Sequence, residues 1–340
     1  MNKLTKIGVS ALCGSLATVS AANAGSMTVA GSANVTYTQL GYGETGNPMG
    51  MGSGLTFTGS GELDNGNTVT LEIVHDDQNT YSNAQIAVDV AGVGTIKFDQ
   101  GGGTGLDRID DMMPTAWEET NGTGVGGGLV TVAGAGGGTD IEWAVSGDML
   151  PDGMAAHISY TPKADGSKSN DKAVAGATGA PVDGAGWDFV VTHNALAEGL
   201  NVFAGYSNIS QGENATSTTG DKQEYALGAT YAVGSITVGY QWSKSDRNGT
   251  NATTSYYEND AYAISFNVND DLSISYGVHE SERNIMGATN VTLEAESLQM
   301  AYSMGGATLK IAETDFDNSS YVSTTAGDKD GTTMMLSLAF

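Results

Sequence analysis

The most constraining feature of this 340-residue chain is a repeated alternation of apolar and polar side chains with a period of two residues. In residues 236–242, isoleucine, valine, tyrosine and tryptophan occupy every second position, separated by threonine, glycine and glutamine. The pattern recurs in residues 141–146, 224–233, 262–268 and 272–278. The last ten residues repeat it and end on an aromatic residue, Phe340. Because successive side chains of a strand point to opposite faces, each segment predicts a β-strand with one apolar face.

The connections between these segments alternate in length. Seven are short turns rich in glycine, asparagine and aspartate, near residues 64–67, 91–94, 149–153, 197–199, 232–235, 267–270 and 304–306. Eight are longer polar segments, expected near residues 41–54, 76–82, 101–138, 162–185, 208–221, 244–258, 280–290 and 316–330. Seven turns and eight loops imply sixteen strands with both chain termini at the end that carries the turns.

Short turns at one end and long loops at the other are typical of β-barrels that cross a membrane. Hydrocarbon offers no partners to unpaired backbone N–H and C=O groups, and a closed sheet leaves none unpaired. We therefore predict an all-β fold, a transmembrane antiparallel β-barrel of sixteen strands. After residue 24 there is no apolar run of about 18 residues, which excludes a membrane-spanning helix.

One expected strand, residues 291–304, departs from the simple pattern. Its apolar set changes parity between Leu293 and Leu298. A change of parity moves side chains to the other face of a strand. The segment therefore predicts either a β-bulge or an upper half that projects beyond the membrane.

Residues 1–24 are typical of a secretory signal peptide. Two lysines precede a short apolar stretch, which is followed by an Ala-Asn-Ala cleavage sequence. Cleavage between Ala24 and Gly25 would remove the only cysteine, Cys13, and leave a mature protein without a thiol or a disulfide. The expected organisation is a signal peptide followed by one barrel domain at residues 25–340.

The chain is strongly acidic, with 39 Asp and Glu against 13 Lys and Arg. Removal of the two lysines of the signal peptide changes the formal charge from −26 to −28, which is 11 minus 39. Such a charge disfavours nucleic acid and anionic surfaces as partners. Charged residues nevertheless make up only 15% of the chain, against roughly 25% in a typical soluble protein.

The signal peptide, the sixteen alternating strands, the long third loop and the terminal Phe340 together resemble the general porins of Gram-negative bacteria. The resemblance covers residues 25–340 and is one of pattern more than of invariant motif. It implies export through the periplasm to the outer membrane and a homotrimer embedded in outer-membrane lipid. Each subunit would be a water-filled channel for passive diffusion of small hydrophilic solutes. The resemblance also implies that Phe340 is the signal read by the barrel assembly machinery.

Small residues at outward positions of the early strands fit the trimer. They are Gly31, Ala33, Gly59 and Gly61, where later strands carry bulky side chains. Small side chains permit close approach of a neighbouring backbone. The alternative is a strand bent by glycine.

The third long loop, residues 101–138, is far longer than a hairpin requires, and loops of this size are usually functional. The resemblance implies that it folds into the barrel as a constriction. Its carboxylates are the expected constriction residues: Asp107, Asp110, Asp111, Glu118 and Glu119. If they face the narrowest water column, they favour cations. The alternative is a solvated external acidic loop. These oxygen ligands could also bind Ca²⁺, but their spacing defines no particular site, and we expect no cofactor.

Inward positions of the strands carry further charged residues, which we expect on the wall of the channel. They are Glu62, Glu72, Asp89, Lys97, Glu142, Glu224 and Lys310. The resemblance implies basic residues opposite the acidic loop, but here only Lys97 and Lys310 stand at such positions, and Arg108 belongs to the loop itself. A transverse field is therefore in doubt. Each inward acid could instead be a packed polar residue without effect on conduction.

Two other classes of function compete with a channel. A β-rich surface adhesin would bind a partner through its long polar loops, but it would not require connections sorted by length. An outer-membrane barrel enzyme would need a catalytic group, and the four histidines, His75, His157, His193 and His279, are scattered without a recognisable nucleophile motif. The sorted connections favour a non-enzymatic, cation-preferring channel.

Overall fold

The computed structural model describes residues 25–43, 46–77, 79–101, 103–136, 139–164, 183–211, 220–249 and 254–340. The expected signal peptide, including Ala24, lies outside the described residues. No helix within these ranges is long and apolar enough to cross a bilayer.

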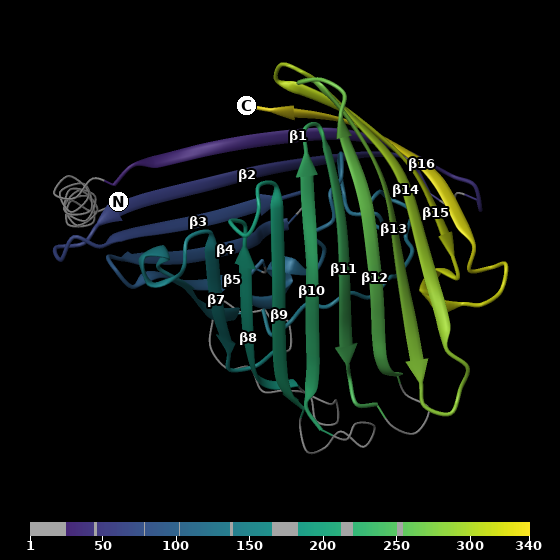
Figure 1. The fold of residues 1–340 in the computed structure, drawn as a ribbon. Coiled ribbons are helices and arrows are strands. Elements are labelled where there is room, and N and C mark those ends of the chain that lie inside the picture. The colour runs from purple at the N-terminus through teal and green to yellow at the C-terminus, as the bar shows by residue number, and fades with distance from the viewer. Residues whose placement is uncertain are drawn as a thin grey trace, which may run out of the picture.

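Sixteen antiparallel strands form one closed barrel, in which each strand pairs with its neighbours in sequence and β1 pairs with β16 (Figure 1). The fold predicted from the alternation is thus confirmed. The strands are β1 (Met27–Leu40), β2 (Met49–Glu62), β3 (Thr68–Asp76), β4 (Asn79–Val90), β5 (Gly94–Gln100), β6 (Thr139–Val145), β7 (Met154–Thr161), β8 (Asp183–His193), β9 (Leu200–Gln211), β10 (Lys222–Val233), β11 (Ile236–Asp246), β12 (Thr254–Asn267), β13 (Leu272–Ile285), β14 (Val291–Met304), β15 (Ala307–Asp317) and β16 (Lys329–Ala339). Short 3-10 helices are η1 (Gly105–Ile109), η2 (Gly147–Met149) and η3 (Ser319–Tyr321).

The connections are sorted between a turn end and a loop end of the barrel, but several predicted loops are wrong in extent. Strands also occupy residues 49–54, 208–211, 244–246 and 254–258 of the segments expected as loops. Pairing of β3 with β4 continues to Asp76 and Asn79, so most of residues 76–82 is strand. Pairing of β13 with β14 likewise reaches Arg283 and Val291. Polar residues form strands here because the outer face of these segments does not need to be apolar once it leaves the lipid.

The barrel closes where the last residue meets the first strand. The backbone N–H of Gly31 donates to the carbonyl of Phe340 at 2.8 Å, and the N–H of Phe340 donates to Gly31 at 2.9 Å. The Phe340 ring lies over Gly31, and a Cβ atom at Gly31 would stand 2.5 Å from its Cε2 atom. Any side chain at this position would therefore require the Phe340 ring to move. Gly59 and Gly61, in contrast, have open space where a Cβ atom would be.

Apolar side chains cover the outer face of the middle of the strands. Leu227, Val238 and Tyr276 are among them, and between 41% and 58% of each is exposed. Towards the loop end, carboxylates replace them on the outer face of β12–β16. These carboxylates include Glu258, Asp260, Glu280, Glu282, Glu294, Glu296, Asp315, Asp317 and Asp330.

Several of these carboxylates are direct cross-strand partners, as in Asp260 with Glu280 and Glu280 with Glu294. Like charges in such positions destabilise a sheet unless water screens them. Tyrosine hydroxyls lie at the boundary, where Tyr276 donates to Glu296 at 2.8 Å. The upper part of β12–β16 therefore projects beyond the membrane into water.

This projection explains the irregular strand. β14 pairs with β13 and β15 without a register shift, so there is no bulge. Leu293 is fully buried on the inner face, whereas Leu298 is 58% exposed on the outer face. The apolar residue changes face because the inside of the upper barrel is filled with protein and its outside is wet.

Most of the buried apolar residues lie inside the barrel, in two clusters that include residues of its wall and of the long segment that follows β5. In one cluster, Leu106, Ile109, Met113 and Val132 of that segment pack against residues of β8–β12, namely Val190, Phe203, Ala226, Ala261 and Ala263. In a second cluster, Val125 packs with Tyr257, Leu293, Ala295, Phe316 and Tyr321. The segment is thus held within the barrel by a core of its own.

Candidate channel constriction

Residues 103–136, which we call the inward loop, run along the inner wall of the barrel in two limbs. In the first limb, Met112 donates its backbone N–H to Gln241 Oε1 of β11 at 3.0 Å. Further along, the backbone N–H of Ala116 donates to Ser275 Oγ of β13 at 2.8 Å, and the backbone N–H of Glu118 donates to Gln299 Oε1 of β14 at 3.0 Å. Inward polar side chains of the wall thus replace the partners that the backbone of the loop would have in a sheet.

The return limb is held by carboxylates of the wall. Glu224 of β10, which is 1% exposed, accepts the N–H groups of Ala133 at 3.2 Å and Gly134 at 2.6 Å. Asp188 of β8 accepts the backbone N–H of Ala135 at 2.9 Å. It also accepts the backbone N–H of Leu106, which belongs to the first limb, at 3.0 Å. These two acids fasten the loop and do not face open water.

A connection at the loop end of the barrel holds the loop from above. The hydroxyl of Tyr321 in η3 accepts the N–H of Val130 at 3.1 Å, and the N–H of Ser320 donates to the carbonyl of Gly127 at 2.6 Å. Ser320 and Tyr321 have left-handed backbone conformations, with φ of 55° and 59°. Residues other than glycine rarely adopt this conformation, so packing against the inward loop must maintain it.

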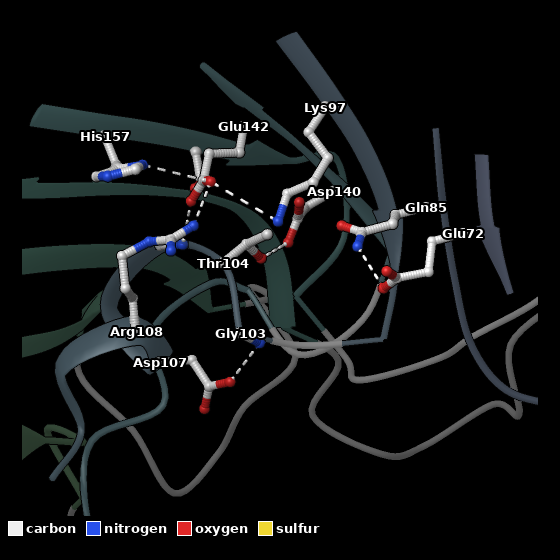
Figure 2. A network of polar contacts seen from close by, with 12 residues as sticks. Glu72, Gln85, Lys97, Gly103, Thr104, Asp107, Arg108, Asp140, Glu142 and His157 are labelled. Carbon is white, nitrogen blue, oxygen red and sulfur yellow. Dashed lines mark hydrogen bonds and ion pairs between the residues drawn. The ribbon is translucent and has the colours of Figure 1, made fainter. Parts of the chain in front are cut away.

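Glu142 of β6 is the centre of a charged network at the start of the inward loop (Figure 2). Its carboxylate is 2% exposed and lies 2.5 Å from Arg108 Nη2 and 3.8 Å from Lys97 Nζ of β5. It also accepts the N–H of Gly105 at 2.9 Å and lies 3.4 Å from Nδ1 of His157. Lys97, which was expected on the wall of the channel, and Arg108 of the loop are therefore bound to one acid.

Figure 2 also shows smaller polar contacts beside this network. Thr104 donates its hydroxyl to Asp140, and Asp107 accepts the N–H of Gly103 at 2.7 Å. On the wall formed by β3 and β4, Gln85 donates to Glu72 at 2.7 Å. Asp107 and Glu72 thus each have a neutral hydrogen-bond partner.

The expected constriction acids differ in their surroundings. Asp110 and Glu119 are half-buried, and Glu118 is exposed. Burial, reinforced by the charges of Asp107 and Asp111, raises the pKa of Asp110 to about 6. Burial, followed by repulsion from Asp110 and Asp111, raises the pKa of Glu119 to about 7. Repulsion of this kind requires the carboxylates to lie close together.

Asp111 belongs to the same group in sequence but points at the wall. Its side chain is 2% exposed, and its Oδ2 atom lies 3.7 Å from Nδ1 of the equally buried His279 on β13. Asp111 Oδ1 accepts the N–H of Met113 at 2.8 Å. This carboxylate shapes the loop more than it meets the water column.

The remaining residues expected on the wall lie away from the inward loop or beneath it. Glu62 and Asp89 are exposed at the turn end of β2 and β4. Lys310 of β15 lies 6.0 Å from the ring centroid of Trp117. Lys310 is thus positioned below the first limb, on the turn-end side of it.

Several residues of the site were not predicted from the sequence. They are Asp188, Gln241, Ser275, Gln299 and Tyr321. The signal for most of them was available, because Asp188 lies at an inward position between the outward Trp187 and Phe189. Nothing local to Tyr321 indicates that its connection turns into the barrel.

A metal site finds no support in the part of the chain that the structure describes. In these residues no group of three or more histidine, cysteine, aspartate or glutamate side chains converges as a set of metal ligands.

Comparisons with known proteins agree with this architecture. A family model described as Gram-negative porin matches residues 8–336. A comparison with curated proteins gave no match.

Solved structures of the same fold include the Salmonella typhi OmpF complex with daunomycin, at 16% identity and a TM-score of 0.67 over 92% of this chain and 97% of that one. The anion-selective porin from Comamonas acidovorans has 14% identity and a TM-score of 0.64 over 93% and 100% of the two chains. The trimer form of OmpT, an outer membrane protein of Vibrio cholerae, has 12% identity and a TM-score of 0.64 over 93% and 99%. At these identities the structures show a shared fold.

Proposed function

The chain belongs to the Gram-negative porin family and is an integral channel protein of the outer membrane, and from this premise we propose that it is a passive, cation-preferring pore for small hydrophilic solutes. The inward loop forms the constriction of this pore, with Asp107, Asp110, Glu118 and Glu119 beside the permeation path.

The observation that carries this proposal is the unequal pairing of charges. Lys97 and Arg108 share the carboxylate of Glu142. Asp110 and Glu119, in contrast, form no ion pair with any described residue, and burial, followed by repulsion from neighbouring acids, raises the pKa of each. The field at the loop is therefore negative, and a narrow water column between low-dielectric walls concentrates it. The fold itself does not set the sign, because the Comamonas acidovorans porin of the same fold is anion-selective.

Reconstitution in planar bilayers tests the proposal directly. We expect stepwise, ohmic conductance and a reversal potential in a KCl gradient that favours K⁺ over Cl⁻. The double variant Asp110→Asn with Glu119→Gln should lower this preference, whereas Glu62→Gln at the turn end should preserve it. Absence of conductance steps would refute the channel. Unchanged selectivity of the double variant would move these acids off the permeation path.

Assembly as a homotrimer follows from the same premise. The open space beside Gly59 and Gly61 supports it, and a protein of the same fold has been solved in a trimer form. Migration in an unheated detergent gel, compared with a boiled sample, distinguishes a trimer from a monomer.

Recognition of Phe340 by the barrel assembly machinery is tested by its removal, which should lower the amount of folded protein in the outer membrane. N-terminal sequencing of the mature protein should begin at Gly25.

The pore is proposed to have no enzymatic activity, since membership of the porin family points to transport. His193 accepts a hydrogen bond from the N–H of Ala195 at 3.1 Å, and His157 faces Glu142. Neither arrangement includes a nucleophile within the described contacts. Replacement of His75 or His193 by alanine should therefore leave conductance unchanged, whereas a barrel enzyme would lose turnover when its catalytic histidine is replaced.

A further inference from the structure

Two arginines at the loop end of the barrel are stacked on one pair of tyrosines. The guanidinium carbon of Arg247 lies 5.0 Å from the ring centroid of Tyr257, and that of Arg283 lies 5.0 Å from the ring centroid of Tyr321. The two rings lie 5.2 Å apart at an angle of 51°. Tyr257 on β12 and Arg283 on β13 are direct cross-strand partners. The four side chains therefore form one cluster, the Arg–Tyr cluster, on the inner face of the mouth.

Among the residues that the structure describes, the two arginines lack the carboxylate partners that Arg108 and Lys222 have. Arg108 is bound to Glu142 at 2.5 Å, and Lys222 is bound to Glu224 at 2.9 Å. Within the described residues, no carboxylate lies within ion-pair distance of Arg247 or Arg283, and the Nε atom of each is buried without an acceptor. Arg283 donates one hydrogen bond, from Nη2 to the carbonyl of Tyr321 at 3.1 Å.

Carboxylates are present near the two arginines, but they lie on the outer face of the barrel wall. Asp246, Glu258 and Glu282 alternate with the inward residues of β11, β12 and β13, so they face outwards. On that face Glu258 is paired with Lys244 at 4.0 Å. The strand period thus places positive charge inside the mouth and negative charge outside it.

The cluster is fixed in place before any ligand arrives. The ring of Tyr321 is 4% exposed and that of Tyr257 is 8% exposed. The hydroxyl of Tyr321 bonds with Ser281 Oγ at 2.7 Å as well as with Val130. A guanidinium that is stacked on a ring keeps its plane fixed and offers its N–H edge to a planar anion, and ordering it beforehand lowers the cost of binding.

We propose that the Arg–Tyr cluster is a binding site for small organic carboxylates in the external mouth of the channel. The proposal rests on the proposed pore and names a ligand for its external mouth, where a bound anion obstructs the cations that the negatively charged constriction favours. A carboxylate matches the forked donors of a guanidinium by two parallel hydrogen bonds, which a spherical anion such as chloride cannot do. Because Tyr321 also accepts a hydrogen bond from Val130 of the inward loop, a carboxylate bound to this cluster lies next to the proposed constriction.

The test uses the reconstituted channel in dilute KCl, with succinate as the probe and its neutral diamide, succinamide, as the matched control. Succinate added at the loop end should reduce the K⁺ current in a saturable manner, and succinamide should have no such effect. Arg247→Gln and Arg283→Gln should each raise the half-blocking concentration of succinate by about tenfold, the scale of one charge-assisted bond. Arg283→Lys retains the positive charge but lacks the forked donors of a guanidinium. Its half-blocking concentration should lie between that of the parent and that of Arg283→Gln.

The matched control variant is Lys244→Gln, which removes one positive charge from the outer face beside the cluster. Succinate should block the Lys244→Gln channel at the same half-blocking concentration as the parent. An unblocked conductance and a heat-dependent gel shift equal to those of the parent show that each variant is folded. Equal block by succinate and succinamide, or equal block of the parent and both arginine variants, would overturn the site. Absence of conductance in the parent would instead overturn the pore itself.

Discussion

Tyr321 and Val130, which are 191 residues apart in sequence, are joined by a hydrogen bond of 3.1 Å from the N–H of Val130 to the phenolic oxygen. The contact links the connection between β15 and β16 to the return limb of the inward loop. Around it, Ser319 Oγ donates to the carbonyl of Gly127 at 3.0 Å, and Lys329 Nζ donates to that of Gly126 at 2.8 Å. The last connection of the barrel thus acts as a strap over the inward loop.

Tyr321→Phe should loosen this strap without unfolding the barrel. The change leaves the N–H of Val130 and the hydroxyl of Ser281 without their shared partner, at a cost of about 1 kcal/mol. We expect larger fluctuations of the open-channel current at an unchanged gel mobility. Tyr302→Phe, on the exposed outer face of β14, is the matched control and should show parent-like noise. Fluctuations of the open-channel current equal to those of the parent would mean that the strap does not restrain the proposed constriction.

Ion preference should depend on pH between about 5 and 8. Asp110 and Glu119 have pKa values raised to about 6 and about 7, so both are ionised at pH 8 and mostly protonated at pH 5. A raised pKa means that negative charge is lost as the pH falls through this range. The reversal potential should therefore shift towards weaker K⁺ preference on acidification. The variant with both amides should show a flatter pH profile, and an equally steep profile would assign the titration to other groups.

Glu142→Gln should weaken cation preference more than the loss of one acid from the turn end. The carboxylate is the shared ion-pair partner of Lys97 and Arg108. Its amide cannot pair with them, so the net charge of the group rises by one and both cations lose their partner. Glu62→Gln, which also removes one negative charge, is the control. The comparison is made by reversal potentials in the same KCl gradient, where similar shifts for the two variants would contradict a pairing role of Glu142.

Gly31→Val should impair closure of the barrel. Its side chain would occupy the position of the Phe340 ring, because a Cβ atom at this residue would stand 2.5 Å from the Cε2 atom of that ring. We expect less folded protein and a lower temperature of the heat-dependent gel shift. Gly59→Val adds the same side chain where no atom lies within 4 Å, so its monomeric barrel should fold as the parent does. Equal folding of the two variants would show that Phe340 moves aside freely.

Leu227→Arg should destabilise the protein in lipid by about 2–4 kcal/mol, the cost of a cation on a lipid-facing position near the membrane midplane. Leu227 is 58% exposed in the middle of β10. Thr230→Arg places the same residue on the inner face of this strand and should cost less, because that face meets water. Urea unfolding in lipid vesicles measures both. A similar loss at the two positions would contradict the assignment of the faces.

Much of this fold follows from short-range patterns. The alternation in residues 236–242 predicts β11 and its two faces, because the strand period is a property of neighbouring residues. The number of strands followed from the sorting of the connections. The ends of strands were less predictable, since polar segments such as residues 280–285 pair as well as apolar ones do once both partners stand in water.

The site was predictable in composition but not in contacts. Inward parity identified Glu142 and Glu224 as candidates, but the partners of Glu224 include a backbone N–H group 90 residues away. Asp110 and Asp111 are adjacent in the chain, yet one faces other acids and the other faces His279. Such differences arise from the path of the inward loop, which is set by packing against distant strands.

The two limbs of the inward loop are bonded to side chains of β8, β10, β11, β13 and β14. Within the described residues, the inward loop and the barrel wall are therefore bonded to each other along both limbs. For the proposed pore we expect an opening of fixed width, which would sort solutes by charge and by how readily they lose their hydration water.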